Sequence, residues 1–60
     1  MNKFFKVTRK NSRGVISVFY ININSISFIS VPASYITINE YGDFDLNQNE
    51  LKELIKLIEN

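Results

Sequence analysis

The chain contains no cysteine and no histidine, and only two of its 60 residues are glycine. Without cysteine it can form no disulfide and has no thiolate nucleophile, and without both residue types it lacks the usual ligands of structural zinc. The missing histidine removes the commonest general base. Gly14 and Gly42 are isolated, so no glycine-rich phosphate loop is present. We therefore expect a protein that is not an enzyme and that uses no cofactor and no metal.

Long apolar runs are also absent. Lys3 and Lys6 are separated by only two apolar residues, so we expect neither an export signal nor a membrane span. The lack of cysteine fits a reducing compartment, and we expect a cytoplasmic protein. Hydrophobic residues make up 45% of the chain and charged residues 22%, which is typical of a globular domain. We expect one small domain over residues 1–60, whose thin core favours self-association or a partner.

Acidic residues are missing from the first 39 positions. Residues 1–39 carry a charge of +5, residues 40–60 carry −4, and together they give the net charge of +1. We favour the interpretation that a basic hairpin and an acidic helix attract each other within one fold. The alternative is a basic surface that meets an acidic partner.

The apolar residue types are unevenly distributed. All four valines and seven of the nine isoleucines precede residue 40, whereas all four leucines lie at or after position 46. Because β-branched side chains favour strands and leucine fits a helix well, this split predicts a sheet followed by a helix. The predicted fold class is α+β: an antiparallel β-meander of four to five strands, followed by one C-terminal helix packed on one sheet face.

Alternation and turn residues place the elements. Asn24 and Ser25 mark a turn or bulge, because the apolar positions change there from odd to even numbers. Within the first strand, Phe5 and Val7 are predicted to point inward. The predicted strands are residues 4–10, 15–23, 26–31 and 34–40, with 44–46 as a candidate fifth, and the predicted helix is 48–59.

The stretch "DFDLNQNELKEL", residues 43–54, places oxygen-bearing side chains at alternate positions, as a calcium loop does. An EF-hand loop needs Gly at its position 6 and Glu at its position 12, where this chain has Gln48 and Leu54. Asn47, followed by Glu50 three residues later, instead predicts a capping box at the start of the helix. The spacing also predicts a buried helix stripe, with Leu57 at its edge: Leu51, Leu54, Ile55 and Ile58.

The second predicted strand is apolar on both faces. If the helix covers one face of the sheet, then Ile16, Val18 and Tyr20, together with Tyr35 of the fourth strand, remain on the other. An apolar and aromatic face of this kind marks an interaction site. We predict that a protein partner, or a second copy in a homo-oligomer, binds at Ile16, Val18, Tyr20 and Tyr35.

Two alternatives stay open. Basic residues near aromatic rings can hold single-stranded nucleic acid, and the candidates are Lys6, Arg9, Lys10 and Arg13. We rank this alternative lower, because the pI near 8.0 is below that of a dedicated nucleic-acid binder. The other alternative is a small inhibitor of a host complex, of the sort carried by phages and mobile elements.

The motifs "KVTR", "YIN" and "PASYITI", followed by an amphipathic C-terminal helix, resemble the small FlbD-type proteins of bacterial flagellar gene clusters. The resemblance spans roughly residues 6–58. The chain departs from the family at "NSRG", where the family turns more tightly, and at "EYGDFDL", which replaces a Gly-Lys stretch and an acidic helix entry. The resemblance implies a small accessory protein that acts through contacts, and it supplies no catalytic residues.

Overall fold

A computed structural model describes residues 3–59 of the chain. It confirms the α+β class, with antiparallel strands followed by a C-terminal helix. The first strand and the helix have their predicted bounds, the second to fourth strands were predicted one or two residues too long at their ends, and the fifth starts at Gly42. The elements are β1 (Phe4–Lys10), β2 (Ile16–Asn22), the 3₁₀ helix η1 (Ile23–Ser25), β3 (Ile26–Ser30), β4 (Tyr35–Ile38), β5 (Gly42–Asp45) and α1 (Gln48–Glu59).

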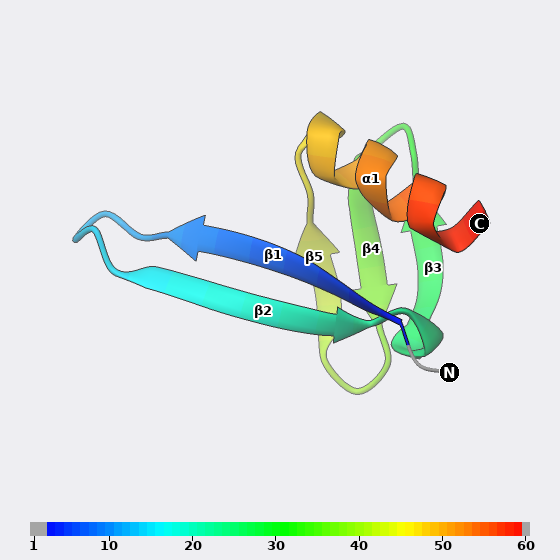
Figure 1. The fold of residues 1–60 in the computed structure, drawn as a ribbon, viewed down its shortest axis with the longest axis horizontal. Helices are drawn as coiled ribbons and strands as arrows, with labels where there is room; N and C mark the ends of the chain where they lie inside the picture. The colour runs from blue at the N-terminus through cyan, green and yellow to red at the C-terminus, as the bar shows by residue number, and fades with distance from the viewer. Residues whose placement is uncertain (1–2, 60) are drawn as a thin grey trace.

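The strands form two sheets rather than one continuous meander. β1 and β2 make a two-stranded hairpin, and β3, β4 and β5 make a three-stranded sheet, with every pairing antiparallel. η1 separates β2 from β3 at the turn predicted for Asn24 and Ser25, and the Asn22 side chain caps it by accepting the Asn24 N–H at 2.9 Å. The hairpin can therefore run across the direction of the other three strands (Figure 1).

The core lies where the hairpin, the three-stranded sheet and α1 meet. Val7 of β1, Ile36 of β4 and Leu54 of α1 are almost fully buried. The inward directions predicted for Phe5 and Val7 are confirmed, because both are buried while their neighbours in β1 are exposed or half-buried. Within residues 3–59 the buried set consists of apolar side chains: Phe5, Val7, Ile21, Ile36, Leu46, Leu51 and Leu54.

The start of α1 has the predicted capping box. The Glu50 N–H donates to Asn47 Oδ1 at 2.8 Å, and the Asn47 N–H donates to Glu50 Oε1 at 3.0 Å.

Leu57 of α1 packs at the core edge as predicted. Ile58, however, is 42% exposed, so its assignment to the buried stripe was wrong. The last turn of α1 lies beside the edge strand β3, and no further strand within residues 3–59 lies beyond β3 to cover Ile58 (Figure 1).

We expect Leu54→Ala to lower the free energy of unfolding by about 2–5 kcal/mol, because it leaves a cavity where all three parts of the core meet. A 60-residue domain has little stability in reserve. The urea midpoint followed by circular dichroism measures the effect. Val31→Ala is the control, since Val31 is exposed beyond the end of β3, and equal losses in the two variants would contradict this placement of the core.

Candidate interaction site

The tip of the β1–β2 hairpin is held by local hydrogen bonds. Asn11 Oδ1 accepts the N–H groups of Arg13 and Val15 at 2.9 and 3.0 Å, and the Gly14 N–H donates to Asn11 O at 3.0 Å. Gly14 has φ +81°, a left-handed conformation that glycine adopts without strain. The connection at "NSRG", residues 11–14, is thus held by hydrogen bonds that fix the register of the two strands.

The hairpin projects from the rest of the molecule. Figure 1 shows its tip far from both the three-stranded sheet and α1. The radius of gyration is 11.7 Å, against about 10.4 Å for a compact domain of this length. In the base of the hairpin the inner side chains Phe5, Val7 and Ile21 reach the core, but nearer the tip every residue from Lys10 to Val18 is exposed.

The outer face of the hairpin, which is the side turned away from the core, gathers exposed apolar groups. Ile16, Val18 and Tyr20 are 61%, 47% and 66% exposed, and they alternate along β2 as predicted. The register of β1 and β2 pairs them with Lys10, Thr8 and Lys6, so a polar and basic column lies beside an apolar one. In residue terms, the outer face of the hairpin is Phe4, Lys6, Thr8, Lys10, Ile16, Val18, Tyr20 and Asn22.

Tyr35 does not join this surface. It belongs to β4 of the three-stranded sheet, where its ring packs against that of Phe28 with centroids 6.0 Å apart. Its neighbour Ile36 points into the core, so Tyr35 lies on the outer side of the other sheet. The prediction of one four-residue face assumed one sheet, and the break at η1 divides that face in two.

The basic candidates also divide. Among residues 3–59, Lys6, Lys10 and Arg13 form no ion pair, and the first two share the outer face of the hairpin. Arg9 instead points to the inner side and forms an ion pair with Glu50 of α1, through N–O distances of 2.7 and 2.9 Å. The favoured interpretation of the charge pattern, attraction between hairpin and helix, is therefore carried by this one pair in the described part of the chain.

Arg9 acts as a clamp between three elements. Besides Glu50, its guanidinium donates to Asp45 O of β5 at 2.7 Å and to Thr8 O at 3.0 Å, and its Cζ lies 5.2 Å from the centroid of the Phe44 ring. These contacts use the planar, multiple-donor geometry of arginine. Arg9 thus makes its contacts within the fold and does not share the outer side of the hairpin with Lys6 and Lys10.

The hydrogen bonds from Arg9 lower the pKa of Glu50 below its ordinary value of 4.5, and the Asn47 N–H of the capping box acts in the same direction, against the opposing effect of desolvation. A carboxylate with a lowered pKa stabilises the fold at pH values above the pKa of the unfolded chain. That contribution disappears as the pH falls through the folded-state pKa.

We expect Glu50→Gln to lower the free energy of unfolding at neutral pH by about 1–2 kcal/mol, because it weakens both the Arg9 clamp and the helix cap. The difference from the parent chain should shrink as the pH drops below the ordinary range of a glutamate. Urea unfolding at a series of pH values measures both effects. Glu53→Gln is the control, since Glu53 is exposed on the same helix, and a pH-independent difference for Glu50→Gln would argue against the clamp.

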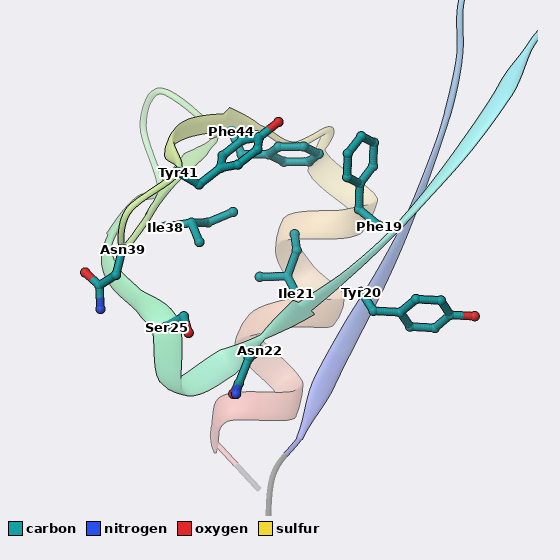
Figure 2. A pocket seen from close by; sticks show the side chains of 9 residues that line it. All are labelled: Phe19, Tyr20, Ile21, Asn22, Ser25, Ile38, Asn39, Tyr41 and Phe44. Carbon is teal, nitrogen blue, oxygen red and sulfur yellow. The ribbon is translucent and has the colours of Figure 1, made fainter.

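A cavity of about 300 Å³ lies beside β2, between the hairpin and the β4–β5 end of the other sheet. Figure 2 shows Phe19 and Ile21 facing Ile38 and Phe44 across it, whereas Tyr20 points away. The Phe19 and Phe44 rings meet edge to face at 5.3 Å. The rim of the cavity is polar and consists of Asn22, Ser25, Asn39 and Tyr41. We refer to it below as the β2 cavity. Sequence reasoning missed it, because it depends on how the two sheets are placed.

In the stretch that resembles a calcium loop, residues 43–54, oxygen-bearing side chains form hydrogen bonds within the fold. Asn47 caps α1, and the Thr37 hydroxyl donates to Asp43 Oδ1 at 2.8 Å. Over residues 3–59, His, Cys, Asp and Glu side chains form no group of three that could hold a metal ion.

No helix in the described part of the chain is long and apolar enough to cross a membrane. No protein-family model matches the chain, and no curated protein or solved structure matches it. The case for function therefore depends on the hairpin surface itself.

Proposed function

We propose that the chain is a small, non-enzymatic protein-binding module that docks through the outer face of its β1–β2 hairpin. The observation that carries this proposal is the exposed row of Ile16, Val18 and Tyr20 on an ordered, projecting hairpin. Adjacent exposed apolar side chains on one face are a mark of an interaction site, whereas singly scattered ones are not. An accessory role of this kind is also what the resemblance to FlbD-type proteins implies.

The composition of the face favours a protein partner over other ligands. Ile16 and Val18 are branched aliphatic side chains, which pack well against other side chains but offer no ring for a base to stack on. Tyr20 adds an apolar ring whose hydroxyl can stay in water, a combination enriched in protein interfaces. The inhibitor of a host complex is a special case of this proposal, in which the partner belongs to the host.

We expect Ile16→Lys to remain folded and to lose the partner. Ile16 is 61% exposed, so the lysine costs little stability, but it places a charge in the middle of an apolar contact. The measurement is capture of proteins from the source cell on the immobilised chain, followed by binding of the identified and purified partner. The dissociation constant should rise by about tenfold or more.

Val31→Lys is the matched control, because Val31 is a similarly exposed aliphatic residue outside the hairpin. It should bind as the parent chain does. If Ile16→Lys is folded by circular dichroism and binds the purified partner with unchanged affinity, the outer face of the hairpin is not the docking surface.

Nucleic-acid binding is the second candidate, favoured by the absence of ion pairs at Lys6, Lys10 and Arg13 within residues 3–59. If it is correct, a single-stranded oligonucleotide should bind at low salt and weaken steeply as salt is added, because phosphate contacts release counterions. A Lys6→Gln, Lys10→Gln double variant should reduce that salt dependence. Absence of binding at low salt would eliminate this candidate.

A further inference from the structure

The outer edge of β2 is a row of backbone groups without partners in the described chain. The Asn11 N–H donates to Val15 O and the Ile23 N–H donates to Lys3 O, which fixes the phase of the ladder. In an antiparallel pair the hydrogen-bonded positions alternate, so the odd-numbered residues of β2 face β1. The N–H and C=O groups of Ile16, Val18 and Tyr20 therefore point away from β1. No strand of the described chain pairs with that edge of β2 (Figure 1).

This edge has none of the usual protection against pairing. Natural edge strands carry charges, proline or bulges that prevent another strand from adding to them. β2 reads "ISVFYIN", with no charged residue and no proline, and it pairs with β1 without a register shift. The cations of the hairpin all lie on β1 or at the tip. An added strand would therefore meet an uncharged edge with apolar side chains.

We propose that the edge of β2 binds the β2 of a second copy of this chain, forming a symmetric dimer with a continuous sheet in the order β1-β2-β2-β1. The inference rests on the proposed function and names the partner of the same surface. A two-fold interface must be self-complementary. With the axis at Val18, Val18 lies opposite the partner's Val18, and Ile16 lies opposite the partner's Tyr20. In that register, outward-pointing backbone groups meet outward-pointing ones, as an antiparallel ladder requires.

The same register brings a side chain of the second copy to the β2 cavity. Val15 of one copy falls opposite the partner's Ile21, and Ser17 falls opposite the partner's Phe19. Val15 is 56% exposed and has the odd-numbered parity of the inner face, on which Ile21 lines the cavity. Its side chain would enter the partner's apolar cavity, and the small Ser17 leaves room for the Phe19 ring. The dimer therefore gives a partner to Val15 as well as to Ile16, Val18 and Tyr20.

Charge placement permits this dimer. Lys6 and Lys10 lie on β1, so in the continuous sheet Lys6 faces the Lys10 of the second copy across three strand spacings, about 14 Å, and each lysine lies farther still from its own copy. That exceeds the screening length of about 8 Å at physiological ionic strength. Stacking the two outer faces against each other would instead bring both sets of lysines into one interface. The edge-to-edge arrangement leaves two separated basic columns beside an apolar centre.

The accessible surface area of the chain is also larger than that of a compact monomer, as expected if a partner covers part of it. It measures 4624 Å², about 600 Å² more than the roughly 4,000 Å² expected of a compact monomer of 7.0 kDa. The projecting hairpin accounts for an excess of this kind, and a standard interface buries about 800 Å² per partner. The surplus surface is thus close to what one dimer interface removes.

The first test is the solution mass by light scattering over a wide range of protein concentration, where the dimer has twice the mass of the 7.0 kDa chain. Val18→Lys places two lysines opposite each other on the axis, and the dissociation constant should rise by about tenfold or more. Val18→Glu should behave likewise. A mixture of the two variants should restore dimers, because each axis then pairs opposite charges. An acidic partner protein would show no such pattern.

A cysteine test does not depend on affinity, because the parent chain has no cysteine. Val18→Cys should cross-link to its own copy on mild oxidation, since directly opposed Cα atoms lie about 5.5 Å apart, within disulfide range. Thr8→Cys is the matched control: Thr8 lies beside Val18 on the same face, but its copies would be about 14 Å apart. It should not cross-link.

Three results would overturn the dimer: a monomer at every concentration, a dimer that persists in Val18→Lys, or equal cross-linking at positions 8 and 18. The proposed function fails separately. If the chain is a monomer but Ile16→Lys still abolishes binding of a purified foreign partner, the docking surface stands and only its occupant is wrong.

Discussion

The guanidinium of Arg9 holds the hairpin against the rest of the fold. It reaches Glu50 at the start of α1, the Asp45 carbonyl of β5 and the Phe44 ring from one position in β1. In the described part of the chain the two sheets share no backbone ladder, so their relative placement depends on core packing and on this contact. Because Glu50 also completes the capping box, the orientation of the hairpin and the start of the helix depend on the same carboxylate.

That contact marks the border between two structurally different halves of the hairpin. From Phe4 to Arg9 the inner side chains are buried or clamped, and this half belongs to the core. From Arg9 to its tip the hairpin extends away from the three-stranded sheet and α1, and the residues from Lys10 to Val18 are exposed. The capped turn at Asn11 keeps this outer half ordered without tertiary support. A surface presented by an ordered ribbon loses little conformational freedom when it binds, which favours affinity.

Periodicity predicted the elements well, because each depends on local preferences. The strand parity, the turn at Asn24 and the cap at Asn47 all follow from neighbouring residues. The inward direction of Arg9 also follows from parity, because Arg9 has the odd numbering of Phe5 and Val7. Its charge had instead suggested a place on the surface. The separation of Tyr35 from Ile16 could not be predicted. It depends on whether β2 pairs with β3, and no local pattern specifies which strands pair across η1.

The uneven distribution of charge and apolar residues has one consistent physical reading. A chain with 45% hydrophobic residues has more apolar groups than so small a core can bury, so some must lie outside. In the described part of the chain, the outer side of the hairpin collects three of them in one row, beside a strand that carries lysine. Lysines on β1 protect that edge from uncontrolled pairing, whereas β2 has no such protection. This asymmetry gives the hairpin one protected edge and one unprotected edge, so the proposed pairing of two β2 edges would end at a dimer.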